Sequence, residues 1–131
     1  MLHKMNLHWQ PFDKIAKGEK DIELRLFDEK RQQLNVGDKI QFDCNDRSCV
    51  LLAVVGALNV YKDFQQLYNS EPLERCGYNP DQLESASYTD MQQYYSKEQV
   101  AKYGVVAIYL KDVTVKEVAD DHIGDDNSTN C

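Results

Sequence analysis

Charged and apolar residues alternate in the segment Lys20-Asp21-Ile22-Glu23-Leu24-Arg25-Leu26, which follows the turn residue Gly18. Alternation with period two is typical of a strand that buries one face. We therefore predict a strand over residues 20–26, with Ile22 and Leu24 in the core. Glu23 and Arg25 then share the opposite face, with Cα atoms about 6.6 Å apart. We expect these two charged side chains to border a cavity.

Further strand patterns lie on both sides of this segment. Apolar or alternating residues predict strands at residues 3–8, 39–43, 49–58 and 105–110. The strand at 49–58 is almost continuously apolar, which suggests burial on both faces. Short helices are expected at residues 12–17, 63–68, 72–76 and 89–102, the last one broken near Ser96.

This order of elements predicts an α+β fold. No helix of ten residues alternates regularly with the strands, as a doubly wound parallel sheet would require. A small mixed or barrel-like sheet of about five to six strands, with short helices over its openings, fits the pattern best.

Length and composition are those of one globular domain. The chain has 131 residues, of which 42% are hydrophobic and 28% are charged, and a domain of this size buries a core of its own. The longest nearly apolar run, residues 50–58, is much shorter than the roughly 20 residues of a membrane-spanning helix. We assign residues 1–116 to the domain. Residues 117–131 are acidic and poor in apolar side chains, so we expect a disordered tail.

The net charge of −7 is concentrated near the carboxyl terminus. Residues 112–131 hold six acidic side chains and one lysine, so they contribute −5, and residues 1–111 carry only −2. Tight binding to long polyanions depends on many cationic contacts to phosphate, but the basic residues between positions 14 and 31 are interleaved with acidic ones. This distribution favours a locally recognised ligand, such as a nucleoside, a nucleotide or a flipped base, over a long duplex.

No metal site and no cofactor are expected. The four cysteines form no Cys-x-x-Cys pair, and the three histidines have no ligand spacing. A glycine-rich phosphate loop is also absent from the sequence. The first six residues lack the apolar run of a signal peptide, so we expect a cytoplasmic protein without a membrane partner.

Three charged residues around the alternating strand suggest a binding site. Glu23 and Arg25 can fix each other on one face, and Lys20 stands at the turn into the strand. A carboxylate accepts hydrogen bonds from amino groups, and a guanidinium offers a fork of donors to carbonyl or phosphate oxygens. The same three residues also fit a solvated strand face with one surface ion pair.

Two aromatic residues are further candidates for the site. Trp9 is expected in the loop before the first helix, where it is placed either to stack on a base or to pack at the edge of the core. Tyr94 and Tyr95 are adjacent on a predicted helix and therefore point in different directions. We take Tyr95 as the one that lines the site.

The spacing Gly-x-Lys-x-x-Glu-x-Arg, here Gly18, Lys20, Glu23 and Arg25, resembles the hallmark of the ASCH domain family. The resemblance to bacterial members extends over about residues 3–111, in the same order. It includes the segments 29–31, 36–38, 76–78, 90–91, 94–98 and 103–106. It implies a PUA-like β-barrel with capping helices, and a cleft beside the motif that serves RNA or nucleotide recognition.

Some smaller members of this broad group resemble amidohydrolases that remove an acyl group from a modified cytidine. The resemblance implies a catalytic lysine at Lys20 and a catalytic glutamate near Glu84. These enzymes carry a threonine three residues after the lysine, where this chain has Glu23.

Three functional hypotheses follow from the sequence. The leading one is binding of RNA or a nucleotide-like ligand, with a base or modified nucleoside held by Lys20, Glu23, Arg25, Trp9 and Tyr95. The first alternative is a hydrolase of a modified nucleoside or of RNA, in which Lys20 acts with Glu84. The second alternative is a protein-interaction module.

Overall fold

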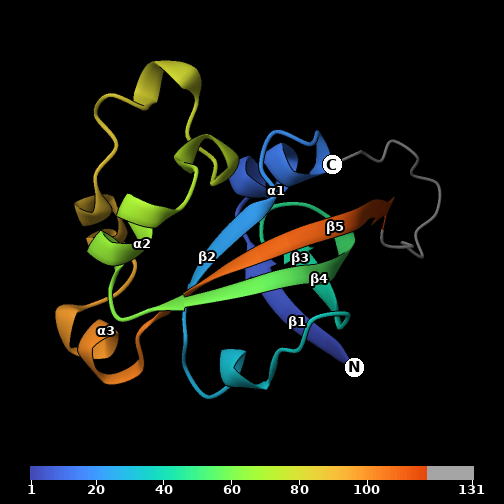
Figure 1. The fold of residues 1–131 in the computed structure, drawn as a ribbon. Helices are drawn as coiled ribbons and strands as arrows, with labels where there is room; N and C mark the ends of the chain where they lie inside the picture. Colours follow the sequence, from blue (N-terminus) through green and yellow to red (C-terminus); the bar gives the residue numbers. More distant parts are fainter. Residues whose placement is uncertain (118–131) are drawn as a thin grey trace.

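A five-stranded mixed sheet forms the body of the protein in the computed structural model, which describes residues 1–117 (Figure 1). The strands are β1 (Leu2–Leu7), β2 (Ile22–Leu26), β3 (Lys39–Cys44), β4 (Cys49–Tyr61) and β5 (Val105–Glu117). Their order in the sheet is β1-β3-β4-β5-β2. β1 runs parallel to β3, and the other neighbours are antiparallel.

The sheet curls until its two edge strands face each other across an open seam. β1 and β2 stand at opposite ends of the strand order, but the Arg25 guanidinium on β2 donates to the Asn6 carbonyl on β1 at 2.8 Å. A curled sheet of five strands with short helices is the α+β, barrel-like architecture that the sequence predicts. The expected acidic tail lies outside the described residues, apart from Glu117 at the end of β5.

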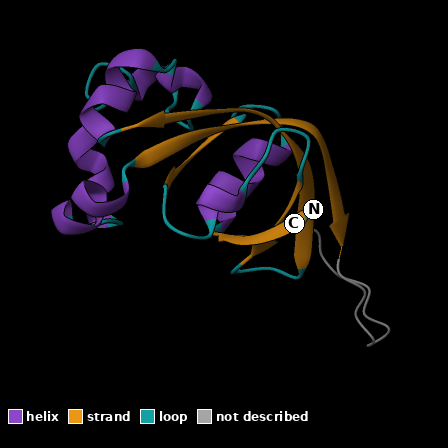
Figure 2. Cartoon of the chain, turned by 60° about the horizontal axis from the view of Figure 1, so that its bottom comes forward, coloured by secondary structure: helices purple, strands orange, loops and turns teal. Residues whose placement is uncertain are grey.

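Residues 1–117 also form three α-helices and four 3-10 turns. They are α1 (Trp9–Ala16), α2 (Phe64–Ser70), α3 (Lys97–Tyr103), η1 (Arg31–Gln33), η2 (Leu73–Arg75), η3 (Pro80–Gln82) and η4 (Tyr88–Gln93). Figure 2 shows α1 inside the curve of the strands, whereas α2, α3 and the turns near them gather at one end of the sheet. The predicted break at Ser96 is confirmed, because its hydroxyl caps α3 by accepting from the Gln99 amide at 3.1 Å.

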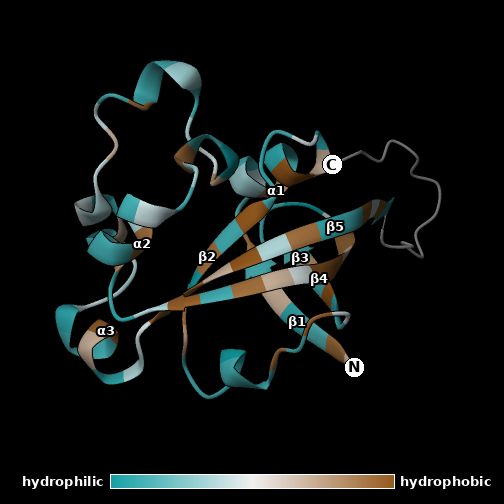
Figure 3. Ribbon diagram, viewed as in Figure 1, coloured by the Kyte–Doolittle hydropathy of each residue, from teal (hydrophilic) through white to brown (hydrophobic). Residues whose placement is uncertain are grey.

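Two hydrophobic cores cover the two faces of the sheet. The inner core packs α1 against the curved sheet through side chains such as Phe12, Ile15 and Phe42. The outer core packs α2 against β2 and β5 through side chains such as Ile22, Phe64 and Leu67. Apolar residues accordingly run along the strands, while the outward surfaces of the helices are hydrophilic (Figure 3).

The register of β2 and β5 explains which side chains of β2 meet which core. Residues directly opposite in an antiparallel pair point to the same face. Leu24 pairs with Ala107, which belongs to the outer core. Glu23 pairs with Ile108, which belongs to the inner core. The charged side chains of β2 therefore point toward the side of the sheet on which α1 lies.

Two expectations about local structure are wrong. The long apolar strand β4 is not buried on both faces, because buried and partly exposed residues alternate from Cys49 to Val55. Within residues 1–117, this part of β4 packs into a core on one face, the face on which α1 lies. Trp9 is not in a loop but is the first residue of α1.

Candidate ligand-binding cleft

A cleft of about 790 Å³ opens where the edges of the curled sheet fail to pair. Its walls come from the end of β1, the first turns of α1, the strand β2 and the long segment between α2 and α3. Small-molecule sites usually occupy about 300–1,000 Å³, so this cleft has the size of such a site. The seam stays open because no hydrogen-bond ladder joins β1 to β2 within the described residues.

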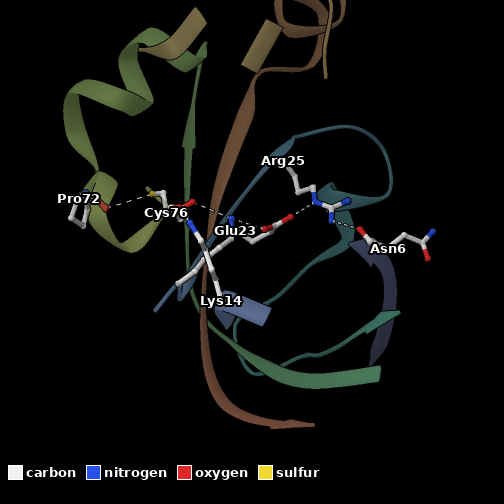
Figure 4. Close-up of polar contacts among 8 residues, drawn as sticks. Asn6, Lys14, Glu23, Arg25, Pro72 and Cys76 are labelled. Carbon is white, nitrogen blue, oxygen red and sulfur yellow. Dashed lines mark hydrogen bonds and ion pairs between the residues drawn. The ribbon is translucent and has the colours of Figure 1, made fainter. Parts of the chain in front are cut away.

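Glu23 stands at the centre of a buried ion cluster in the wall of this cleft. Its side chain is 6% exposed. One carboxylate oxygen, Oε1, lies 3.1 Å from Lys20 Nζ, and the other, Oε2, accepts from Arg25 Nε at 2.6 Å. Figure 4 shows the Glu23 carboxylate pointing at Arg25, whose guanidinium reaches on to Asn6. The three charges are therefore arranged as an ordered group and not as a solvated surface pair.

Lys20 reaches Glu23 because it precedes the strand. In a regular strand, positions 20 and 23 would face opposite sides, but β2 begins only at Ile22. Lys20 Nζ also donates to the Cys76 carbonyl at 3.1 Å, which ties the motif to the segment after η2. Gly77 adopts φ +112°, and a Cβ atom there would lie 3.3 Å from Lys20 Cδ, so the glycine makes room for the lysine.

Burial and charge act against each other on the protonation of this cluster. Burial raises the pKa of Glu23, but the positive charges of Lys20 and Arg25 and their hydrogen bonds outweigh it, so its pKa lies below the usual range. Burial likewise lowers the pKa of Arg25, and the Glu23 carboxylate more than compensates, so that pKa is raised. Both side chains therefore remain charged at neutral pH.

Lys14 is a third cation of the cleft, and the sequence analysis did not identify it. Its Nζ donates to the Gly77 carbonyl at 2.5 Å and to Asn79 Oδ1 at 3.0 Å. The consecutive carbonyls of Cys76 and Gly77 thus hold Lys20 and Lys14, respectively. The only sequence signal for this contact was the segment 76–78 in the family resemblance, because Lys14 itself looks like an ordinary helix residue.

The aromatic candidates both line the cleft. Tyr95 stacks on Phe64 with ring centroids 5.9 Å apart, and burial raises the pKa of its hydroxyl. Trp9 carries the Arg47 guanidinium over its ring at 3.9 Å from the centroid. A base that stacks on this face of Trp9 must displace Arg47 or stack on the guanidinium itself.

Glu84 is not brought to the cleft. It is exposed, lies between η3 and η4, and is absent from the cleft walls. The structure thus gathers five of the six candidate residues, namely Lys20, Glu23, Arg25, Trp9 and Tyr95. The roles assigned to all six remain predictions.

A hydrogen-bonded chain of two tyrosines and one aspartate forms another part of the cleft wall. The hydroxyls of Tyr68 and Tyr78 are 2.7 Å apart, and Tyr78 donates to Asp90 Oδ2 at 2.6 Å. The sequence analysis missed these hydrogen bonds because the three residues lie far apart in the sequence, in α2, in the loop between η2 and η3, and in η4. Segments 76–78 and 90–91 of the resemblance contained two of them without indicating a contact.

The charged side chains of the cleft wall balance one another. Three are basic (Lys14, Lys20, Arg25) and three are acidic (Glu23, Asp46, Asp90).

Within residues 1–117, no three His, Cys, Asp or Glu side chains gather as metal ligands would. The same residues contain no helix that is long and apolar enough to cross a membrane.

The fold has relatives among solved structures. A hypothetical protein, PH0355, is 32% identical with a TM-score of 0.70, and the match covers 85% of this chain and 98% of that chain. Protein PF0455 from Pyrococcus furiosus is 33% identical with a TM-score of 0.63, over 85% and 96% of the two chains. The ASCH protein from Zymomonas mobilis is 16% identical with a TM-score of 0.58, over 85% and 67%, and shares the fold.

Comparison of the sequence with known protein families shows the family to which the chain belongs. No curated protein gives a significant match. The ASCH domain family matches residues 5–114, which is most of the chain and includes every residue of the ion cluster. The protein therefore belongs to the ASCH domain family, whose PUA-like fold is generally linked to RNA binding.

Proposed function

We propose that the cleft binds RNA or a nucleotide-like ligand by holding one base or modified nucleoside beside Lys20, Glu23 and Arg25. The observation that carries this proposal is the buried ion cluster in the wall of an open cleft. Burying three charges away from water costs free energy unless they are paired in good geometry. An ordered cluster at such a position is typical of a functional site.

Counting donors shows what the cluster offers to a ligand. An ammonium has three N–H donors and a guanidinium has five. Lys20 directs donors to Cys76 and Glu23, and Arg25 directs donors to Glu23 and Asn6. The remaining donors suit the carbonyl oxygens of a base or the oxygens of one phosphate.

The balance of charge in the cleft argues for a compact polar ligand. Three basic and three acidic side chains give no net attraction for a run of phosphates. The aromatic rings of Trp9 and Tyr95 supply flat apolar surfaces of the kind that bases stack on. The ligand that fits both features is a single base or nucleoside, free or splayed out of a single-stranded RNA.

The test is calorimetric titration of the protein with nucleoside monophosphates and with short single-stranded RNAs. We expect binding that weakens little between 50 and 200 mM salt, because few phosphates are neutralised. Arg25→Ala should weaken binding by about tenfold or more, since it removes ligand donors and the partner that orients Glu23. Lys102→Ala, which removes an exposed cation on α3 outside the cleft, is the matched control.

Two results would contradict this proposal. One is the absence of binding by every nucleotide and RNA tested, and the other is equal affinity of Arg25→Ala and the wild type. Chromatography of the same mixtures, with acylated cytidines included, tests the hydrolase alternative. Turnover by the wild type would show that the cleft is an active site and not only a binding site.

A further inference from the structure

The hydroxyl of Tyr68 has a fixed donor direction because of the two residues beyond it. Tyr78 donates its single proton to Asp90 Oδ2 at 2.6 Å, and the Ser87 amide also donates to this oxygen. A phenol has one O–H donor, so Tyr78 has none left for Tyr68. In the 2.7 Å contact between the two hydroxyls, Tyr68 must therefore be the donor.

This direction leaves Tyr68 with acceptor capacity only. Its one proton is used within the chain Tyr68–Tyr78–Asp90, and its oxygen keeps lone pairs. Tyr68 also lines the cleft, so a bound ligand meets an oxygen that accepts and does not donate. Both phenols keep their protons at neutral pH, because burial raises the pKa of Tyr68 to about 12 and, with the Asp90 contact, raises that of Tyr78 still further.

We infer that Tyr68 is a specificity-determining residue that selects ligands presenting an N–H donor, such as the exocyclic amino group of adenine or cytosine. The inference rests on the proposed function and specifies the chemistry of its ligand. A carbonyl oxygen in the same place would face the lone pairs of Tyr68, and an unsubstituted ring position would leave them unpaired.

The two walls of the cleft then offer complementary chemistry. Lys20 and Arg25 supply donors on the β2 side, whereas Tyr68 supplies an acceptor on the α2 side. A ligand that satisfies both walls carries an amino group and, at a distance from it, a carbonyl or phosphate oxygen. Nucleotides with an amino-bearing base meet this requirement.

The experiment compares matched nucleotides by calorimetric titration of the full chain. Adenosine 5′-monophosphate is compared with purine riboside 5′-monophosphate, and cytidine 5′-monophosphate with its analogue that lacks the 4-amino group. We expect at least one amino-bearing member to bind about tenfold more tightly than its partner, which is the factor that one hydrogen bond typically contributes. The pair that shows this difference identifies the base.

Two variants assign the effect to Tyr68 and to its proton direction. In Tyr68→Phe, the preference for the amino group should fall to about twofold or less. In Tyr78→Phe, Tyr68 regains a free proton, so a carbonyl in place of the amino group should be accepted better. Inosine 5′-monophosphate or uridine 5′-monophosphate, according to the base identified, is the probe for that gain. Tyr88→Phe, at an exposed tyrosine outside the cleft wall, should leave all ratios unchanged.

The outcomes separate this inference from the proposed function. Nucleotide binding without any preference for the amino group would overturn the role of Tyr68 and leave the cleft as a nucleotide site. A preference for the amino group that persists in Tyr68→Phe, with an unchanged melting curve, would also overturn the role of Tyr68. If no nucleotide or RNA binds the wild type, the proposed function fails and this inference fails with it.

Discussion

Lys20 Nζ lies 3.1 Å from Glu23 Oε1, and the two side chains are almost completely buried. They meet because the chain turns between them, with Asp21 bonded through its amide to the Arg75 carbonyl before β2 begins. The Lys20 ammonium is thereby held at one oxygen of the Glu23 carboxylate, while Arg25 binds the other oxygen. One carboxylate thus orients two cations of the cleft.

Removing this carboxylate should destabilise the protein strongly. Glu23→Ala leaves two cations buried without a counter-charge, and breaking a buried ion pair in this way costs about 3–5 kcal/mol. Urea unfolding at pH 7 measures the loss. Glu84→Ala, at an exposed glutamate, should change the free energy of unfolding by less than about 0.5 kcal/mol. Similar values for the two variants would contradict the buried cluster.

Acid should weaken the fold through the same carboxylate. The pKa of Glu23 is lower in the folded protein than its ordinary value of 4.5. The unfolded chain therefore takes up protons first as the pH falls, so the stabilisation is complete above about pH 4.5 and is lost below it. Melting temperatures measured between about pH 6 and pH 3 should show this decline.

Glu71 contributes to the same decline and provides the comparison. Burial raises the pKa of Glu71, but hydrogen bonds from Tyr109, Tyr61 and Asn59 lower this pKa by more than burial raises it. The net pKa is therefore below the ordinary value. Glu23→Gln and Glu71→Gln should each make the melting temperature less dependent on pH in this acid range. An undiminished decline in Glu23→Gln would show that the cluster is not the source.

Gly77→Ala should impair ligand binding as well as stability. Its Cβ would press on Lys20 at 3.3 Å, and φ +112° strains any residue with a side chain. Gly37→Ala is the matched control, because Gly37 has φ +96° with nothing within 4 Å of the added atom. Both variants should lose about 1–2 kcal/mol of stability, but only Gly77→Ala should bind nucleotides more weakly. Equal binding by the two variants would show that Lys20 does not need this space.

Replacing Lys20 separates an electrostatic role from a catalytic one. Lys20→Arg keeps the positive charge but does not release a proton at accessible pH, whereas Lys20→Met removes the charge and keeps most of the apolar stem. For a binding residue, we expect Lys20→Met to lose about tenfold or more in affinity and Lys20→Arg to retain most of it. If the wild type hydrolyses a nucleoside, loss of turnover with retained binding in Lys20→Arg would indicate a base or nucleophile.

The local sequence alone determined the strand β2 and the face shared by Glu23 and Arg25. Strict alternation has one structural solution when one face is buried, because a shift by one residue would place every apolar side chain in water. The cap at Ser96 was predictable for the same kind of reason, since it depends on residues three positions apart. These features need no knowledge of distant parts of the chain.

Tertiary structure decided what surrounds that strand. The contacts of Lys20 with Cys76 and of Lys14 with Gly77 join residues 56 and 63 positions apart. The tyrosine chain that ends at Asp90 and the seam where Arg25 reaches Asn6 likewise depend on how the sheet curls. No local pattern encodes such contacts, because they result from the packing of α1 and α2 on opposite faces of the sheet. The sequence therefore determined which charged residues share a face, and the packing decided which groups they meet.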